Sequence, residues 1–400
     1  MPLAYRGSGG VRVIDLPDLR AALREAAVDG WLLFDFHGLN PVAGRVLELK
    51  GMNTRRLFVL LPRDGEPVAV VHKIELQGLE GFPGRIVPYA RWSELHAALA
   101  SLVSGRRLAM EISPEDAVPY LDRVPYGVVE LLRRLGATVV PSGSLVSRFA
   151  ARWSAAEADD HRAAAEILAT VARDALARAT KQADQGLTES KLQSQVVEAV
   201  KDRGLVFDTL PIIGFGPNSA KPHYEPHPGN DRTLQTGEVI LLDLWAGRTR
   251  NTVFADQTWM GFAGARVPDQ VARVWKTVRD ARDAAIRMVQ QAAAEQRPIA
   301  GYEVDQAARA VIEADGFGDE FVHRTGHSID RDLHGSGPHM DDYETHDERL
   351  LVPGVGFSIE PGIYLSGEFG IRSEVNMFLG EGGPEVTPGS PQRELILARS

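Results

Sequence analysis

Four segments of the sequence place one carboxylate inside an apolar run. Asp243 stands in "VILLDLWA" and Asp256 in "VFADQTWM", while Glu360 and Glu374 stand in "GFSIEPGIY" and "GIRSEVNMFL". A single residue of this kind has simple explanations, because a core aspartate can accept backbone hydrogen bonds and a strand glutamate can face solvent. Four carboxylates that converge in a core would repel one another and would not all ionise. A pair of divalent cations, of the kind that activates water for hydrolysis, would resolve that conflict.

A histidine-rich segment, "FVHRTGHSIDRDLHGSGPHM", adds nitrogen donors. His323 and His327 have the H-x-x-x-H spacing of a zinc-binding helix, but Arg324 stands where zinc proteases have a glutamate base. Gly326 would also weaken a helix at this point, so we predict a loop or a strand edge. One imidazole in an otherwise all-oxygen set suits manganese, cobalt or zinc and disfavours copper and iron–sulfur chemistry.

The scaffold that must position these residues changes its pattern along the chain. The first part alternates helical and strand-like segments, which predicts an α/β domain with a mixed sheet. A hairpin turn is expected at Gly65, in "PRDGE". The predicted helices are 16–28, 92–103 and 128–135, and the predicted strands are 31–34, 56–61, 67–72, 107–112 and 138–140.

The second part does not alternate strictly, and we predict an α+β domain. Ser154 and Glu157 form a capping box before an alanine-rich helix, and Thr188 and Pro268 mark the starts of two more. The predicted helices end near 182, 204 and 294, and a fourth covers 303–314; the predicted strands are 210–215, 239–245, 252–260, 357–359, 371–379 and 394–398. We expect the domains to be residues 1–152 and 153–400.

The composition is ordinary for a soluble globular protein. The chain has 400 residues, 44% apolar and 24% charged, so it can bury large cores in two or three domains. Its net charge of -10 does not favour a nucleic-acid or anionic-membrane partner. The absence of cysteine excludes disulfides, thiolate zinc sites and thiol nucleophiles. No signal-like or membrane-spanning apolar run is apparent, and we expect a cytoplasmic location.

The second part resembles the pita-bread metallopeptidases, a family that includes methionine aminopeptidase, aminopeptidase P, prolidase and creatinase. The motifs "LLDLWAG", "ADQT", "HRTGHSI", "SIEPGIY" and "GIRSEV" stand in the family's order. The preceding α/β domain resembles the layout of prolidase and aminopeptidase P. The resemblance therefore implies a creatinase-like N-terminal domain followed by a pita-bread catalytic domain.

The resemblance also implies two divalent metal ions, with manganese favoured and cobalt or zinc as alternatives. Their ligands would be Asp243, Asp256, His327, Glu360 and Glu374. In the family pattern Asp243 serves one ion, His327 and Glu360 serve the other, and Asp256 and Glu374 bridge them. A hydroxide between the ions would be the nucleophile, and Glu360 would pass the water's proton towards the leaving nitrogen.

Further residues match family positions beside the substrate. His223, in "AKPHYEPH", would lie on the leaving-group side, and His323 would contact the substrate. His334 would stabilise the charge that develops on the carbonyl oxygen. Arg372 precedes Glu374 by two residues, so strand alternation places both on one face. There Arg372 would orient a ligand carboxylate or contact substrate.

Two features depart from the family pattern. The spacing from Asp243 to Asp256 is longer than usual, and the extra residues fall in the turn "AGRTRNT", where a longer loop need not change the strand register. Gln257 replaces an apolar residue, but on a strand its side chain would point away from the ligands. No family position matches the remaining histidines of the second part, which we expect at the surface: His227, His339 and His346.

The histidine set and the N-terminal domain favour the proline-specific branch, and the chain looks most like the short bacterial Xaa-Pro dipeptidases. Its substrate would be a small peptide with proline in second position. A dipeptidase must recognise the free carboxylate of proline, for which His223, His334 and Arg372 are candidates. The segment 35–45, "DFHGLNPVAGR", is a candidate loop that could contribute. Aminopeptidase P, which acts on longer peptides, is the alternative.

Two other functions are disfavoured by the intact ligand set. Members of this fold that act as metal-free binding modules typically lose ligands, and none is missing here. Creatine amidinohydrolysis requires a guanidinium site rather than a dimetal centre. Dimerisation is common among the relatives, so we expect a homodimer.

Overall fold

The computed structural model describes residues 15–49, 53–250 and 252–398. Contacts divide the chain into two compact units, Met1–Ala150 and Ala151–Ser400, and each is described by itself. In the described ranges no helix is long and apolar enough to cross a membrane.

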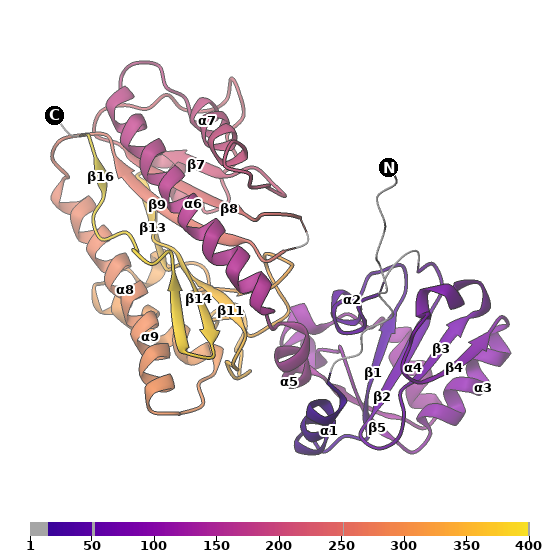
Figure 1. Cartoon of the computed structure of the whole chain (residues 1–400). Coiled ribbons are helices and arrows are strands. Elements are labelled where there is room, and N and C mark those ends of the chain that lie inside the picture. The colour runs from indigo at the N-terminus through magenta and orange to yellow at the C-terminus, as the bar shows by residue number, and fades with distance from the viewer. Residues whose placement is uncertain (1–14, 50–52, 251, 399–400) are drawn as a thin grey trace, which may run out of the picture. The chain divides into compact units, whose positions relative to one another are not determined.

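The first unit is built on a mixed six-stranded sheet with the order β4-β3-β2-β1-β5-β6 (Figure 1). β1 is antiparallel to β2 and parallel to β5, and β3 is parallel to β4, which confirms the predicted mixed sheet. Its strands are β1 Gly30–Asp35, β2 Leu57–Pro62, β3 Val68–His72, β4 Arg85–Tyr89, β5 Arg107–Met110 and β6 Thr138–Pro141. Its helices are α1 Leu16–Glu25, α2 Pro41–Leu47, α3 Trp92–Val103, α4 Tyr126–Arg134 and the short α5 Gly143–Leu145.

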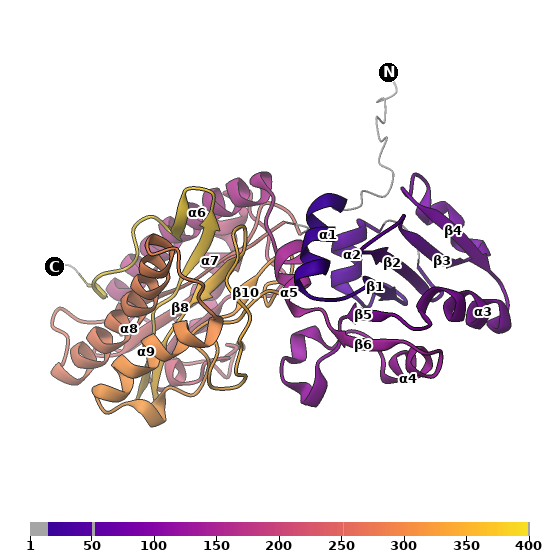
Figure 2. The same cartoon turned by 90° about the horizontal axis from the view of Figure 1, so that it is seen from below.

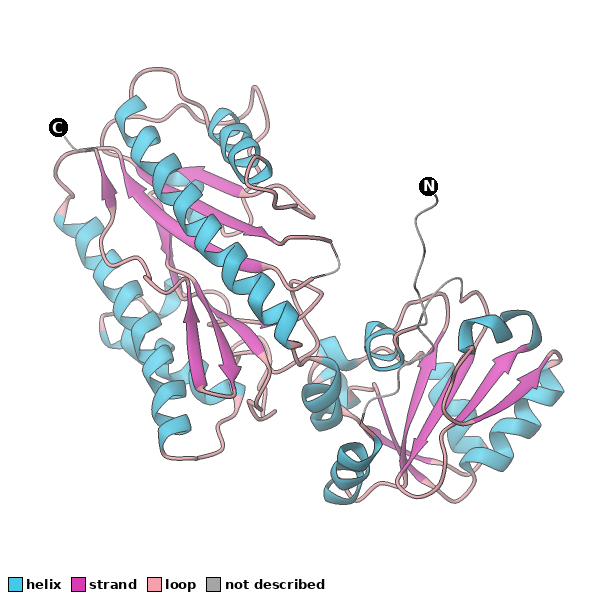
Figure 3. Ribbon diagram, in the orientation of Figure 1, coloured by secondary structure: helices cyan, strands magenta, loops and turns pink. Residues whose placement is uncertain are grey.

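Helices cover both faces of this sheet (Figure 3). Trp31 and Leu33 of β1 pack with α1 and α2, whereas Leu32 and Phe34 pack with α3 and α4. A strand buried on both faces must be apolar at nearly every position, which is why β1 lacks the alternation of a half-exposed strand. The predicted hairpin between β2 and β3 is confirmed, with Gly65 at a φ of 101°.

The candidate loop 35–45 is only partly a loop. Helix α2 begins at Pro41, because the Asn40 side chain caps it by accepting hydrogen bonds from the backbone of Val42 and Ala43. The strand β4 was also missed by sequence reasoning, since half-exposed residues and a proline conceal its pattern.

The second unit contains a four-stranded sheet of order β16-β9-β8-β7, a second of order β10-β11-β14-β15, and the hairpin β12-β13. The strands are β7 Ile212–Phe215, β8 Val239–Ala246, β9 Ala255–Phe262, β10 Ser328–Ile329, β11 Gly356–Ile359, β12 Gly362–Leu365, β13 Phe369–Arg372, β14 Val375–Gly380, β15 Gly383–Thr387 and β16 Ile396–Leu397. The helices are α6 Ala155–Ala179, α7 Glu189–Lys201, α8 Asp269–Ala294 and α9 Gly301–Ala314.

The sheet of β8 and β9 separates two hydrophobic cores. Leu242 and Leu244 on one face pack with α6 and α7. Leu241 and Met260 on the other face pack with α8, α9 and the strands β11 to β14. In both views α8 and α9 lie side by side (Figures 1 and 2). This α+β arrangement is the pita-bread fold that the resemblance implies.

The predicted helix starts in this unit are confirmed. Ser154 and Glu157 form the capping box of α6, and the Thr188 hydroxyl accepts a hydrogen bond from the backbone of Lys191 in α7. Pro268 is the N-cap residue of α8.

The predicted strand 371–379 is wrong in one respect, because it is broken at Ser373 and Glu374. β13 pairs with β12, whereas β14 pairs with β11 and β15, so the chain passes between two sheets at this point. Arg282 holds the break by donating a hydrogen bond of 2.7 Å to the Ser373 hydroxyl. Glu374, one of the predicted metal ligands, stands at this break between β13 and β14.

Candidate metal centre

Asp243 and Asp256 share one face of the hairpin β8–β9. Asp243 is paired with Thr258, and Asp256 precedes Thr258 by two residues, so the three side chains point the same way. They point towards the core of α8 and α9, and both aspartates are buried. The strands pair without interruption from Val239 to Ala246, so the longer turn leaves their register regular.

Gln257 points to the opposite face, as predicted. It is fully buried, donates a hydrogen bond of 2.9 Å to the Ala165 carbonyl of α6, and accepts one from the Trp259 indole. Its amide therefore joins β9 to α6 and does not reach the carboxylates.

Asp256, His327 and Glu374 offer ligand atoms that all lie within 4.8 Å of one another. The Nε2 atom of His327 is 3.5 Å from an Asp256 oxygen and 3.3 Å from a Glu360 oxygen. Glu374 lies beside β9, where its Oε2 accepts a hydrogen bond of 2.8 Å from the Thr258 hydroxyl. The structure therefore gathers side chains from β9, the segment before β10, the end of β11 and the β13–β14 break.

Asp243 joins this cluster through Arg372. The guanidinium donates to the Asp243 carboxylate through Nη2 and to the Thr258 hydroxyl through Nε at 2.9 Å. The same hydroxyl contacts Glu374, so Arg372 and Glu374 do converge although the strand that carries them is broken. Arg372 is buried, and its Nε and Nη2 atoms are both engaged by protein groups of the cluster.

The backbone fixes the orientation of the His327 ring. Its Nδ1 atom lies 3.1 Å from the Ser328 carbonyl oxygen, and that contact requires a proton on Nδ1. The lone pair of the neutral ring is then on Nε2, the atom that faces Asp256 and Glu360. Burial opposes a charge on the ring, but these two carboxylates outweigh it and raise the pKa of His327.

The protein groups around the four carboxylates do not suffice to keep all of them ionised. Burial raises the pKa of Asp243 to about 7 in spite of Arg372, and burial with the neighbouring acids raises the pKa of Glu374 well above its usual range. Burial also raises the pKa of Asp256. Glu360 differs, because His327 and Arg372 outweigh its burial and lower its pKa to about 2.

Two buried oxygens test whether cations fit this cluster. Oδ1 of Asp243 and Oε1 of Glu374 have no hydrogen-bond partner among the described residues. A buried carboxylate oxygen without a donor is costly. Divalent cations would supply both the missing contacts and the missing positive charge, so the residues present fit a metal site.

Three predicted substrate residues lie around the cluster. His323 contacts the Tyr364 hydroxyl through Nε2 at 2.8 Å and the Arg324 carbonyl through Nδ1 at 2.7 Å. The His334 ring is exposed and its centroid is 4.2 Å from that of His327. His223 is exposed on the loop after β7 and close enough to His334 for their charges to interact.

Sequence reasoning missed Thr258, Ser358 and Tyr364. Ser358 accepts a hydrogen bond from the His327 amide at 2.9 Å and donates one to Glu360 at 3.0 Å. Thr258 and Ser358 are strand residues that each stand two positions from a predicted ligand, so alternation could have found them. Nothing in the sequence places Tyr364 beside His323, since that contact joins separate segments.

The expectation that His339 lies at the surface is wrong. Its side chain is 1% exposed, and its Nδ1 accepts a hydrogen bond of 3.2 Å from the Ser328 amide. The cause is the return of the chain after β10, where Gly326 pairs with Met340 and carries His339 inwards. His227 and His346 are exposed, as predicted. Residues 321–327 are not helical, which confirms the rejection of the zinc helix.

A pita-bread domain that buries carboxylates and an imidazole in this way defines a metal-dependent hydrolase. The chain belongs to metallopeptidase family M24, whose family model matches residues 159–381. Membership implies divalent metal ions and a peptide substrate.

Relatives match this chain over different shares of its length. It is 26% identical over 349 residues to "Probable dipeptidase PepE" of Mycobacterium tuberculosis, and the match covers 86% of each chain. It is 30% identical over 191 residues to the Xaa-Pro dipeptidase of Lactobacillus helveticus, a match that covers 47% of this chain and 48% of the relative. The solved structure of dipeptidase PepE from Mycobacterium ulcerans superposes with a TM-score of 0.73 at 25% identity and covers 96% of both chains.

Proposed function

We propose that this protein is an Xaa-Pro dipeptidase, which hydrolyses the peptide bond before proline in dipeptides with the help of two divalent metal ions. The observation that carries the proposal is the buried carboxylate cluster with two unpartnered oxygens, on Asp243 and Glu374. The names of the mycobacterial and lactobacillar relatives support the dipeptidase activity. Aminopeptidase P activity on longer peptides is the second candidate, because the same cluster would serve either reaction.

The proposed ligands are the five residues that the sequence resemblance selects. Asp243 would hold one ion, His327 and Glu360 the other, and Asp256 and Glu374 both. When bound, the ions would supply an acidified water and polarise the scissile carbonyl. Manganese is our proposal for both ions, since the donor set is almost entirely oxygen.

Glu360 is the proposed proton carrier. His327 and Arg372 lower its pKa, so it is ionised at neutral pH and can accept a proton from the attacking water. Its side chain is 14% exposed, more than those of Asp243, Asp256 and His327. The Ser358 hydroxyl occupies Oε1 and thereby fixes the carboxylate while the leaving nitrogen is protonated.

The histidines around the cluster are proposed to bind the substrate. The exposed rings of His223 and His334 are the candidates for the proline carboxylate and for the developing carbonyl charge. His323, held by Tyr364, would contact the substrate from the buried side. Arg372 is proposed to orient Asp243 rather than to contact substrate, because its guanidinium is occupied by Asp243 and Thr258.

A substrate panel tests this proposal. Xaa-Pro dipeptides and Xaa-Pro-Yaa tripeptides are assayed with manganese and with cobalt, and the dipeptides should be cleaved faster. Faster cleavage of the tripeptides would favour aminopeptidase P instead. Absence of bound metal and of any activity after manganese addition would refute both and would favour a binding module.

Other properties of the protein are also proposals. We propose a catalytic domain of residues 153–400 after an N-terminal domain of residues 1–152, a homodimer, and a cytoplasmic location. Light scattering tests the dimer, and metal analysis of the purified protein tests the identity of the ions.

A further inference from the structure

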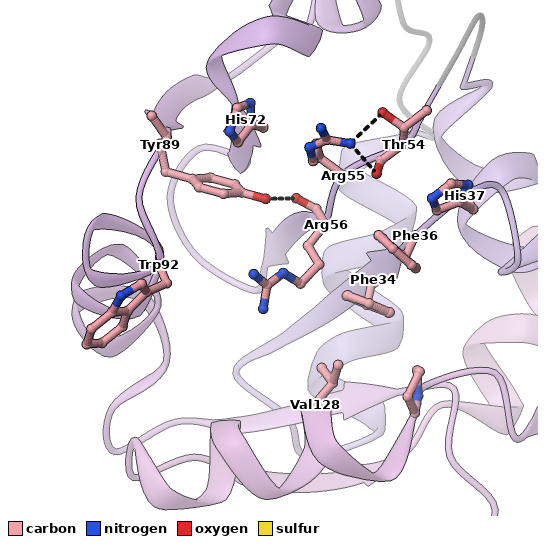
Figure 4. Close-up of a pocket in the computed structure, with 12 residues that line it drawn as sticks. Phe34, Phe36, His37, Thr54, Arg55, Arg56, His72, Tyr89, Trp92 and Val128 are labelled. Atoms are coloured by element: carbon pink, nitrogen blue, oxygen red, sulfur yellow. Dashed lines mark hydrogen bonds between the residues drawn. The ribbon is translucent and has the colours of Figure 1, made fainter.

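A cavity of about 630 Å³ lies in the first unit, at the edge of the sheet where β1, β3 and β4 end (Figure 4). Phe34, His72 and Tyr89 line it from the ends of these strands. Helices α3 and α4 both begin at the same edge, with Trp92 and Val128 in their first turns. Small ligands bind α/β sheets at the carboxyl ends of their strands, and helix N-termini favour anions there.

The lining of this cavity is cationic although the whole chain has a net charge of -10. Arg55 and Arg56 contribute two guanidiniums to it, and the described residues that line it include no aspartate or glutamate. Neither guanidinium has a carboxylate within 4.0 Å in the described part of the chain. An anion in the cavity would therefore meet two guanidinium charges, which the single carboxylate of Glu75 beside the Thr54 and Arg55 backbone offsets only in part.

The arginines stand on the short segment just before β2, which other groups hold in place. Glu75 accepts hydrogen bonds of 2.7 Å from both the amide and the hydroxyl of Thr54, and one of 3.3 Å from the Arg55 amide. The Tyr89 hydroxyl donates a bond of 2.7 Å to the Arg56 carbonyl. The Arg56 backbone is thus fixed while its side chain extends into the space drawn in Figure 4. A positioned guanidinium can bind an anion with less loss of entropy.

Aromatic rings flank the charged centre on opposite sides (Figure 4). Trp92 is 71% exposed and Phe36 is 40% exposed, whereas Phe34 and Tyr89 are buried. Exposed aromatic rings beside a cation can cover a planar apolar group while the cation holds its charged end. Charge and aromatic surface therefore meet in the same cavity.

We propose that this cavity binds a small aromatic anion, with Arg56 as the main charge partner and with Trp92 and Phe36 as the surfaces that cover its ring. The site is a binding site of the first unit and needs none of the residues of the candidate metal centre. It would give the protein a ligand in addition to its peptide substrate.

Calorimetric titration of the metal-loaded protein with benzenesulfonate tests the proposal, because a sulfonate is a poor metal ligand and is always charged. Methyl phenyl sulfone keeps the ring without the charge, and methanesulfonate keeps the charge without the ring. We expect benzenesulfonate to bind with a Kd on the order of 1 mM, as suits so small a ligand. Both partial analogues should bind at least about tenfold more weakly.

Variants locate the binding. Arg56→Gln should weaken benzenesulfonate binding about tenfold, since one charge-assisted contact is lost. Trp92→Ala should weaken it several-fold. Arg85→Gln, an exposed arginine at the start of β4 and outside the cavity lining, should bind as the wild type does. Circular dichroism of each variant confirms that the fold is retained.

Quenching of Trp92 fluorescence gives an independent readout, since the other described tryptophans are much less exposed. The proposal is overturned if benzenesulfonate produces no heat and no quenching at ten times the expected Kd. It is also overturned if Arg56→Gln binds as tightly as the wild type, or if the neutral sulfone binds as tightly as the sulfonate.

Discussion

Replacement of Thr258 by valine should weaken metal binding although Thr258 is not a proposed ligand. The threonine is 1% exposed, its hydroxyl donates to Glu374 at 2.8 Å, and it accepts from Arg372 at 2.9 Å. Valine has nearly the same shape but no hydroxyl. Thr258→Val therefore removes both hydrogen bonds without opening a cavity.

The magnitude follows from these two contacts. A hydrogen bond to a charged group contributes about 1.5–3 kcal/mol, and loss of the hydroxyl leaves Glu374 Oε2 without its donor and Arg372 Nε without its acceptor. Outer partners of metal ligands typically change metal affinity by about 10–100-fold, which is about 1.4–2.8 kcal/mol. We therefore expect Thr258→Val to raise the manganese Kd about 10–100-fold and to lower kcat.

The assay is a manganese titration against a competing fluorescent chelator, with dipeptide hydrolysis measured on the same samples. Thr258→Ser keeps the hydroxyl and should stay within about threefold of wild type. Thr277→Val is the matched control, since Thr277 is equally buried but lies on α8 and bonds Asp315. Unchanged manganese affinity in Thr258→Val, or an equal loss in Thr277→Val, would refute the reasoning.

Three further predictions concern other parts of the second unit. Glu374→Gln should abolish turnover and weaken manganese binding. The melting temperature of the metal-free protein should not fall, because the substitution removes a buried acid with an unpartnered oxygen. Unaltered turnover would contradict this prediction. Burial lowers the pKa of His161 to about 4, whereas its pKa in the unfolded chain is 6.5. Below pH 6.5 the unfolded state therefore binds a proton that the folded state does not, and the stability present above pH 6.5 is lost as the pH falls towards 4. Between pH 7 and pH 4.5 the free energy of unfolding, measured with urea, should therefore fall by about 2–3 kcal/mol less in His161→Gln than in the wild type. Equal decreases in the two proteins would contradict the prediction. Glu189→Gln should lower kcat/KM with little change in manganese Kd, because the Glu189 carboxylate accepts hydrogen bonds from Phe215, Asn218, Tyr224 and Arg232 and so holds the loop that carries His223; limited proteolysis within 216–232 should become faster, and an unchanged cleavage rate would show that the loop does not depend on this carboxylate.

Local rules account for the parts of the fold that the sequence predicted. The capping box at Ser154 and Glu157, the turn at Gly65 and the helix 92–103 depend on residues close together in the chain. The apolar settings of Asp243 and Asp256 predicted two strands, and Gln257 was expected to point away from Asp256 because side-chain direction alternates with every residue. These features need no knowledge of the rest of the molecule.

Long-range contacts account for what the sequence did not predict. The contact between Arg372 and Asp243 spans 129 positions, and the strand break at Ser373 and Glu374 exists because β13 and β14 pair in different sheets. His339 is buried for the same kind of reason, since the chain returns and pairs across Gly326.

The sequence by itself therefore determined which family supplies the fold and that Gln257 points away from the ligand face of its strand, and it predicted which residues could bind metal. Only the tertiary structure decided that Thr258 joins Arg372 to Glu374, that Tyr364 holds His323, and that a cationic cavity forms at the edge of the first sheet. The physical reason is that strand faces and caps follow from local backbone geometry, whereas these contacts and this cavity require segments distant in the chain to pack together.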